Sequence, residues 1–181
     1  MSNIVYIATS LDGYIATKEG GLDWLHSIPN PEGSDLGFND FMASIDALVM
    51  GRKTFETVCS FDCPWPYSKP VFVLSQSLTE IPEQFQDKAE LITGSAQEIT
   101  QQLQRQGFNH LYIDGGLTVQ SFLQAELIDE LIITRIPIVL GGGIPLFGEL
   151  VSPQSFEHVK TEVLLDALVK SHYRKTPLIS P

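Results

Sequence analysis

The chain has 181 residues, of which 43% are hydrophobic and 18% charged, so it suits a single folded domain over residues 1–181 rather than extended disorder. The formal net charge of −11 disfavours binding to nucleic-acid phosphates. We also expect a cytoplasmic protein without a membrane anchor, because the sequence offers no secretion signal and no run of about 18 apolar residues.

The first part of the chain predicts two short strands, a long loop and a helix. The apolar run 4–9 indicates a buried strand, and residues 13–16 return after a turn. Residues 17–34 are rich in Gly, Pro and Ser, which is typical of a loop that covers a binding site. A helix follows, because one face collects Phe38, Phe41, Met42 and Ile45 at helical spacing.

The middle of the chain alternates strands with helices. The expected elements are a strand at 46–50, a helix from about residue 53, strands at 70–75 and 89–93, and a helix that ends near Gly107. Continuous β-branched and aromatic residues at 70–75 favour a strand that is buried on both faces. Ser95 and Glu98 have the spacing of a capping box, which predicts where the second helix begins.

The last part of the chain predicts the fold class. The expected elements are a strand at 110–114, a helix at 117–126, a long strand at 128–140 interrupted by Pro137, and a hairpin at 156–175. About eight strands in this order predict a three-layer α/β/α fold, with a mostly parallel sheet and an antiparallel C-terminal edge hairpin. An exposed sheet edge needs protection, so we expect the protein to form a homodimer in which this hairpin pairs across a two-fold axis. The apolar residues expected at the contact are Val159, Val163, Leu165, Leu168 and Val169.

Two strand-to-helix turns carry the residue types that hold phosphate groups. The first consists of Gly51, Arg52, Lys53 and Thr54, and the second of Gly115, Gly116, Leu117 and Thr118. Helix N-termini offer free N–H groups, and glycine lets a phosphate approach the backbone. Each turn is also consistent with a strand-to-helix connection that binds no ligand. In the first turn the basic residues would be solvated, and in the second the glycines would serve a tight turn with positive φ. Two such corners after parallel strands favour a shared ligand site at one edge of the sheet.

Three further segments have weaker signals. Ser75, Gln76 and Ser77 follow a strand where an NAD site usually has an acidic residue, which favours NADP, although they also fit a serine-rich turn. Glycines 141–143 indicate an irregular connection more than a ligand contact. Cys59 and Cys63 are expected to be reduced thiols, and we expect no metal site because the four histidines are scattered.

The motifs IATSLDGYIA, GGLDW, DALVMGRKTFE, VFVLS, LYIDGG and PIVLGGGIPLFG occur in this order. Their order and spacing resemble the dihydrofolate-reductase-like superfamily over essentially the whole chain. The chain is more similar to stand-alone relatives of the reductase domain of the bifunctional riboflavin-biosynthesis deaminase-reductase than to the folate enzyme.

The resemblance implies an NADPH site and assigns residues to it. Thr9 and Ile15 would flank the nicotinamide, and Trp24 would belong to the active-site loop. The implied phosphate and adenosine contacts are Gly51, Arg52, Lys53 and Thr54, then Leu74, Ser75 and Gln76, then Gly115, Gly116, Leu117, Thr118 and Val119. Asp12 lies in a segment that is near the substrate in the riboflavin relatives, or it makes a turn with Gly13.

The catalytic acid and the substrate are less determined. Asp35 precedes the helix where folate enzymes carry their carboxylate, but an Asp at this place also caps a helix, and Asp40 is a weaker alternative. Phe38, Phe41 and Met42 form either a pocket wall or a core face, and nothing selects Lys18 or Arg135 for a substrate phosphate. We expect hydride transfer to a small heterocyclic or sugar-derived substrate. The alternatives are a non-catalytic NADP(H)-binding regulatory module and a purely structural subunit.

Overall fold

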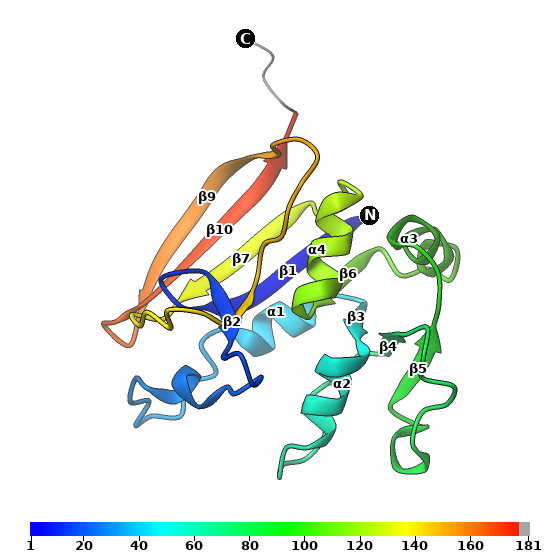
Figure 1. Cartoon of the computed structure of the whole chain (residues 1–181), viewed down its shortest axis with the longest axis horizontal. Helices are drawn as coiled ribbons and strands as arrows, with labels where there is room; N and C mark the ends of the chain where they lie inside the picture. Colours follow the sequence, from blue (N-terminus) through cyan, green and yellow to red (C-terminus); the bar gives the residue numbers. More distant parts are fainter. Residues whose placement is uncertain (178–181) are drawn as a thin grey trace.

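The computed structural model describes residues 1–177, which form an eight-stranded sheet with helices on both faces (Figure 1). The strand order is β5-β4-β3-β6-β1-β7-β10-β9. The strands are β1 (Ser2–Thr9), β3 (Ala47–Gly51), β4 (Val71–Leu74), β5 (Ala89–Ile92), β6 (His110–Asp114), β7 (Glu130–Arg135), β9 (Ser155–Leu164) and β10 (Leu168–Thr176). Neighbours from β5 to β7 are parallel, and β10 is antiparallel to both β7 and β9. The expected mostly parallel sheet with an antiparallel edge hairpin is therefore confirmed.

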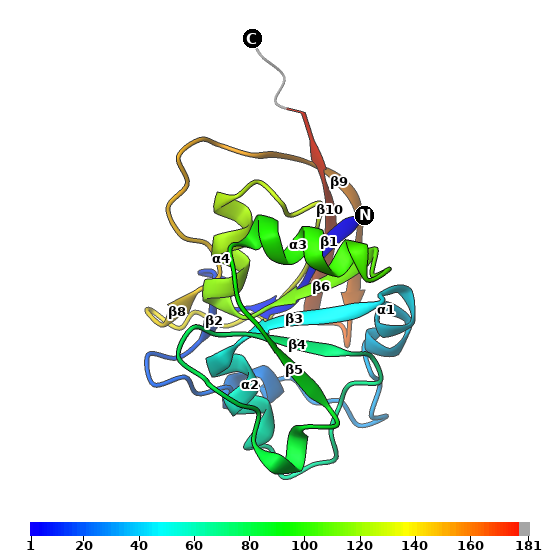
Figure 2. The same cartoon turned by 90° about the vertical axis from the view of Figure 1, so that its right-hand side faces the viewer.

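Helices cover the two faces of the sheet in pairs (Figure 2). The helices are α1 (Phe38–Ser44), α2 (Arg52–Cys59), α3 (Ala96–Arg105) and α4 (Gly116–Gln124), with short 3-10 turns at Asp23–His26 and Glu83–Phe85. The helices α3 and α4 share one hydrophobic core with their face of the sheet, and α1 and α2 share a second core with the other face. None of the helices within residues 1–177 is long and apolar enough to cross a membrane.

Local sequence signals produce several of these boundaries. The Ser95 hydroxyl accepts a hydrogen bond from the Glu98 amide, and the Glu98 carboxylate accepts one from the Ser95 amide at 2.8 Å, which confirms the capping box. Gly107 has φ +94° just beyond α3, a conformation that glycine adopts without strain. Strand β4 is buried along nearly its whole length, as its continuous apolar sequence predicts.

The expected long strand at 128–140 is wrong, because β7 ends at Arg135. The Ile136 amide still bonds the Thr9 carbonyl, but Pro137 has no N–H to continue the ladder. The Ile138 amide then bonds the Ile136 carbonyl at 2.7 Å, which closes a three-residue turn. Beyond this turn, β8 (Ile144–Pro145) pairs with β2 (Tyr14–Ala16) in a separate two-stranded ribbon.

Candidate cofactor-binding site

The two glycine-marked corners lie side by side at the carboxyl edge of the sheet. Strands β3 and β6 are parallel neighbours, and Met50 is paired with Asp114 where both strands end. Helix α2 begins immediately after Gly51, and α4 begins immediately after Gly115. The two helix N-termini therefore open toward the same place, which is where ligands of open α/β sheets bind.

The two corners contact each other through matching pairs of glycine and threonine. A Cβ atom added to Gly51 would lie 2.8 Å from the Thr118 hydroxyl oxygen, and one added to Gly115 would overlap with the Thr54 hydroxyl oxygen. Gly115 also has φ +90°, a conformation that other residues rarely adopt. Each glycine thus lets the threonine of the opposite helix approach its backbone closely, and the two corners are in direct contact at the cradle between the two N-termini.

The charges at α2 fit an anionic ligand. Neither α2 nor α4 has a side-chain cap, so their first N–H groups remain available. The first turn of α2 has Arg52 and Lys53 and no acidic residue, which is the unfavourable arrangement for a helix dipole without a bound anion. Among the described residues, Arg52 forms one ion pair, an exposed contact with Glu56 at 3.4 Å. A phosphate placed here would meet free amides and two cations.

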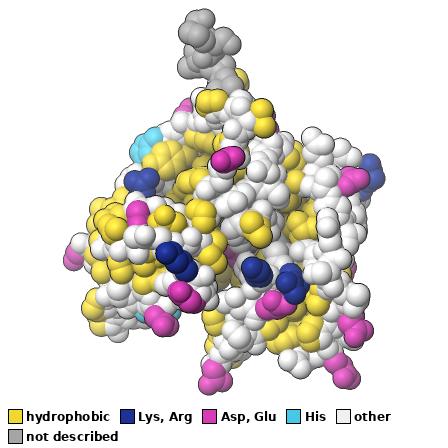
Figure 3. Space-filling model, in the orientation of Figure 1, with side chains coloured by type: hydrophobic (Ala, Val, Ile, Leu, Met, Phe, Trp, Pro, Cys, Tyr) yellow, Lys and Arg dark blue, Asp and Glu magenta, His cyan; other side chains and the backbone are white. Residues whose placement is uncertain are grey.

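The short ribbon of β2 and β8 forms the neighbouring wall of the cradle. A Cβ on Gly116 would lie 3.0 Å from the Ile15 side chain, so the start of α4 packs directly on the ribbon. A Cβ on Gly143 would overlap with the Ala16 carbonyl, so the triple glycine permits a close approach of two backbones. Figure 3 shows Lys and Arg side chains on both sides of the furrow between the ribbon and α2.

The other residues expected at the cofactor differ in accessibility. Thr9 is buried at the end of β1, where its carbonyl accepts the Ile136 amide. Leu117 is 73% exposed on the first turn of α4. Val119 is fully buried in the core beneath α4, so its side chain stabilises the helix and does not face the cradle.

The residues after β4 form a turn that is held by a serine. The Ser75 hydroxyl oxygen accepts hydrogen bonds from the amides of Ser77 and Leu78, at 3.2 and 2.9 Å. Ser75 is buried, Leu74 is half-buried and Gln76 is exposed. The serine-rich turn is thus present, and two backbone amides occupy the Ser75 hydroxyl oxygen.

The carboxylate of Asp35 is engaged at the start of α1. It accepts hydrogen bonds from the amides of Gly37 and Asn39, both at 3.0 Å. The hydrogen bond from Asn39 holds the pKa of Asp35 below its ordinary value. Gly37 holds the N-cap position of α1, and Asp35 binds the first amides of the helix from two residues before it. These contacts favour the structural alternative, because a general acid needs a pKa near neutral. Asp40 is exposed on the same helix.

Asp12 binds the protein's own backbone. Its carboxylate accepts the amides of Leu140 and Gly141 at 3.1 and 2.8 Å and the Ser10 hydroxyl at 2.6 Å. The Ser10 hydroxyl lowers the Asp12 pKa most strongly. Asp12 therefore anchors the triple-glycine loop to the first turn, and its oxygens have few free positions for a substrate.

Asp114 is the carboxylate whose surroundings suit proton transfer, and the sequence reasoning assigned it no catalytic role. Leu111 and Ile113 face the core under α3 and α4, and Tyr112 faces the opposite core. Strand alternation therefore places Asp114 on the face of α1 and α2. Burial raises the pKa of Asp114 to about 6. The hydrogen bond from the Gly115 amide, at 2.8 Å, lowers this pKa but does not offset the effect of burial. An acidic residue at the end of a central apolar strand was the available signal.

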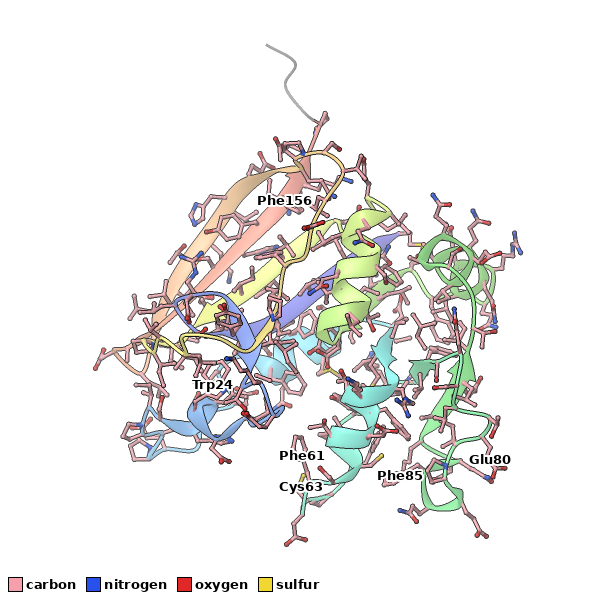
Figure 4. The ribbon with its side chains drawn as sticks, in the orientation of Figure 1. Trp24, Phe61, Cys63, Glu80, Phe85 and Phe156 are labelled. Atoms are coloured by element: carbon pink, nitrogen blue, oxygen red, sulfur yellow. The ribbon has the colours of Figure 1, made fainter. Side chains whose placement is uncertain are left out.

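The expected substrate-pocket residues divide between core and surface. Phe41 and Met42 are buried, and Phe41 stacks on Tyr6 at 4.3 Å, so both belong to the core. Phe38 is half-buried at the start of α1. Trp24 is buried against Ile136 and Leu168, and it fastens the 17–34 loop to the sheet (Figure 4).

Two basic residues and two cysteines complete the expected set. The Lys18 side chain lies close to Gly142 in the triple-glycine loop, and Arg135 is exposed at the end of β7. Cys59 is half-buried and Cys63 is exposed, and both are free thiols. Figure 4 shows Cys63 in the loop that follows α2.

Comparisons with known proteins agree with this architecture. Residues 3–169 match the RibD C-terminal domain family. The chain is 38% identical over 173 residues to YwjB of Bacillus subtilis (strain 168), covering 94% of this chain and 95% of YwjB. The crystal structure of a Shewanella sp. PV-4 protein named "Putative riboflavin biosynthesis protein" is 58% identical with a TM-score of 0.95, covering 98% of this chain and 100% of that protein.

More distant solved structures show the same fold. Dihydrofolate reductase from Enterococcus faecalis, solved with NADP(H), has a TM-score of 0.67 at 22% identity, covering 97% of each chain. The Thermotoga maritima diaminohydroxyphosphoribosylaminopyrimidine deaminase/5-amino-6-(5-phosphoribosylamino)uracil reductase has a TM-score of 0.74 at 15% identity, covering 97% of this chain and 56% of that one. The chain therefore has the dihydrofolate-reductase-like α/β fold and belongs to the RibD C-terminal domain family.

Proposed function

We propose that this single-domain protein is an NADPH-dependent reductase. Its substrate would be a small pterin-like or pyrimidine-like heterocycle, or a sugar derivative, with a reducible C=N or C=O bond. The observation that carries the proposal is the cradle of two helix N-termini, in which Gly51 faces Thr118 and Gly115 faces Thr54. Family membership and the dihydrofolate-reductase-like fold support the same activity.

The residues of the cradle fit the phosphates of NADPH. Amides at the starts of α2 and α4 would bind the pyrophosphate, with the hydroxyls of Thr54 and Thr118 at the sides. Arg52 would bind the 2′-phosphate beside the Ser75 turn, because no acidic residue stands there to hold an unphosphorylated ribose. When bound, NADPH supplies a hydride, that is, two electrons and one hydrogen, to the substrate carbon.

The protein must also supply a proton to the nitrogen or oxygen of the reduced bond. We assign this role to Asp114, directly or through a water molecule, because its raised pKa keeps part of the population protonated near neutral pH. Asp114 lies immediately before the phosphate-binding corner, so one strand end would bring the cofactor and the acid together. The engaged carboxylates of Asp35 and Asp12 support this choice over either of them.

A binding experiment tests the cofactor proposal. NADPH and NADH are titrated into the protein by calorimetry, for the wild type, Arg52→Ala and Arg105→Ala. We expect tighter binding of NADPH than of NADH, and about tenfold weaker NADPH binding for Arg52→Ala, the scale of one charged phosphate contact. Arg105, an exposed arginine on α3, is the matched control and should leave both affinities unchanged.

The outcomes separate the candidate functions. Binding of neither nucleotide would contradict the reductase. Tight NADPH binding without oxidation of NADPH across a panel of pterins, pyrimidines and sugar lactones would favour the regulatory module. We further propose a cytoplasmic homodimer. The free thiols Cys59 and Cys63 suit a reducing compartment, and the open edge of the hairpin suits a second copy.

A further inference from the structure

The pairing between β1 and β6 ends partway along both strands. Strand β1 lies between β7 and β6, and it pairs with β7 as far as Thr9 (Figure 1). Its pairing with β6 stops at Ile4, which stands opposite Tyr112, although β6 continues along β3 to Asp114. The sheet therefore has a fork between two central strands, and the fork opens toward the glycine-marked corner that follows β6.

One specific backbone hydrogen bond is missing at the fork. The Ser2 amide donates to the Asn109 carbonyl at 2.7 Å. In a parallel ladder, the carbonyl of the same residue accepts the amide two residues farther along the partner strand, and the pattern recurs at every second residue. Continued into the fork, this pattern would bond the Gly115 amide to the Tyr6 carbonyl. The strands separate before this bond forms, so both groups need other partners.

Two side chains from β6 supply those partners. The Tyr112 hydroxyl donates to the Tyr6 carbonyl at 2.9 Å, and the Asp114 carboxylate accepts the Gly115 amide at 2.8 Å. Tyr112 and Asp114 are two residues apart on one strand, so their side chains point to the same face of the sheet. A hydrogen bond also joins the two side chains. The pair thus replaces the backbone bond that the fork lacks.

The Tyr112 hydroxyl has one hydrogen and two acceptors within reach, the Tyr6 carbonyl and the Asp114 carboxyl group. The ring is 6% exposed, and Phe41 packs against it edge-on at 5.1 Å, which fixes the ring and leaves the hydroxyl hydrogen free to rotate. When Asp114 is protonated, Tyr112 can donate to the carbonyl and accept from the carboxyl group. When Asp114 is ionised, the carboxylate is the stronger acceptor of the two.

Asp114 is the group of this cluster that titrates near neutral pH. Burial raises the pKa of Tyr112 well above its ordinary value, so its hydrogen stays on the hydroxyl. Tyr6 from β1 and Tyr67 from the segment before β4 also act on Tyr112, and burial raises the pKa of each of them as well. The direction of the Tyr112 hydrogen therefore depends on the proton of Asp114.

We propose that Tyr112 is a positioning residue, whose hydroxyl hydrogen turns from the Tyr6 carbonyl to the Asp114 carboxylate when Asp114 gives up its proton. That proton leaves for the nitrogen or oxygen of the reduced bond, and the O–H bond of Tyr112 stays intact. The new hydrogen bond stabilises the carboxylate that remains after proton transfer. The role in turnover rests on the proposed reductase, whereas the exchange of hydrogen bonds can be measured without it.

A measurement on the wild type tests the exchange directly. The backbone carbonyl signal of Tyr6 and the carboxyl signal of Asp114 are followed by carbon NMR across pH in the ligand-free protein. The Asp114 signal is identified by its loss in Asp114→Asn. We expect both signals to titrate with one midpoint of about 6, and the Tyr6 signal to stay constant in Asp114→Asn. A Tyr6 signal that does not follow Asp114 would overturn the proposal.

Tyr112→Phe removes the hydroxyl and keeps the ring. The ionised Asp114 then lacks a donor, so its midpoint should move about one pH unit higher, the scale of one hydrogen bond to a charged group. The Tyr6 signal should no longer follow Asp114. Turnover should fall with rising pH at the same higher midpoint. Below that midpoint it should be about tenfold slower than in the wild type, because the carboxylate left after proton transfer lacks its donor.

Tyr173→Phe is the matched control. It removes the same atom from a tyrosine of β10 that packs on the opposite face of the sheet, and it should change neither midpoint nor turnover. A Tyr112→Phe protein that is folded by circular dichroism, with an unchanged or lower Asp114 midpoint, would overturn the proposal. A wild type that oxidises no NADPH would instead contradict the reductase, and the NMR midpoints would still decide whether Tyr112 exchanges its partner.

Discussion

The two glycine-marked corners and the start of α1 differ in how far a local pattern determines the role of a side chain. At the corners, Gly51 and Gly115 follow buried strands and precede helices, and the structure places both where a cradle requires them. At α1, the same kind of reasoning offered Asp35 as an acid or a cap, and its hydrogen bonds favour the cap. A corner of this kind can be recognised locally, because the strand end, the glycine and the helix start are adjacent in the sequence. An acid is selected by burial, which depends on the whole fold.

The pKa values of Asp114 and Asp35 are shifted in opposite directions. Asp35 is exposed and accepts two backbone amides, and the Asn39 amide in particular lowers its pKa. Asp114 accepts one backbone amide and is half-buried at the end of a central strand, and this burial raises its pKa to about 6. The number of amides and the degree of burial thus decide which carboxyl group can deliver a proton at neutral pH.

The largest expected effect concerns this pair of carboxylates. Asp114→Asn should lower the turnover rate about 10³-fold, within the usual range for loss of a general acid, and leave the NADPH affinity within about twofold. Asp35→Asn should change turnover little. In the wild type, turnover should fall as the pH rises through about 6, because the proton on Asp114 is lost there. Steady-state rates across pH check this. An Asp114→Asn enzyme with wild-type turnover would remove Asp114 from the mechanism.

The second effect concerns the cradle. Gly115→Ala adds a Cβ at φ +90° that overlaps with Thr54, and strain and crowding together should lower the free energy of unfolding by about 3 kcal/mol. Denaturant titration measures it. Gly107→Ala is the matched control, because Gly107 has φ +94° and open space around its Cα, so only about 1 kcal/mol is expected.

A double variant separates the two contributions at Gly115. Adding Thr54→Ala to Gly115→Ala removes the hydroxyl that the new Cβ meets, and should recover the crowding part but not the strain. Purely additive free energies would mean that the two corners do not contact each other in the way the structure shows. Both Gly115→Ala and the double variant should also bind NADPH more weakly than the wild type, because the added Cβ displaces the amides at the start of α4.

Much of the fold follows from local signals in the sequence. The capping box at Ser95, the apolar run of β4 and the glycine beyond α3 each fix a boundary without reference to distant residues. The strand expected at 128–140 shows the limit. Its apolar residues continue past Arg135, but Pro137 ends the ladder and the chain turns toward the ribbon with β2.

The candidate site divides in the same way. The corners depend on glycines, helix starts and basic residues, all of which the sequence displays. Whether Val119 and Met42 can reach a ligand depends on which side of their helix faces the core. Both side chains are buried, so they do not line the site. The raised pKa of Asp114 depends on side chains from several elements, so no short pattern indicates it.

A third effect concerns stability across pH. The Asp114 pKa is about 6 in the folded protein against an ordinary 3.8, so the folded state holds this proton more tightly. The stability from this group is complete below pH 3.8 and is lost as the pH rises through 6. For a fully buried group the loss would be about 3 kcal/mol, and we expect about half because Asp114 is only half-buried. Asp114→Asn should therefore be more stable than the wild type at pH 7.5 and equal to it at low pH, as measured by urea titration.

The smallest expected effect concerns the Ser75 turn, where the sequence left a cofactor contact and a structural role both open. The Ser75 hydroxyl oxygen accepts two backbone amides, so Ser75→Ala should lower the free energy of unfolding by about 1 kcal/mol. Because those amides already occupy the oxygen, the preference for NADPH over NADH should change less than in Arg52→Ala. Parallel urea and nucleotide titrations of the two variants measure both quantities. A Ser75→Ala protein that keeps wild-type stability but loses its preference for NADPH would contradict the structural role of Ser75. The Ser75 hydroxyl of the wild type would then bind the 2′-phosphate and would not stabilise the turn.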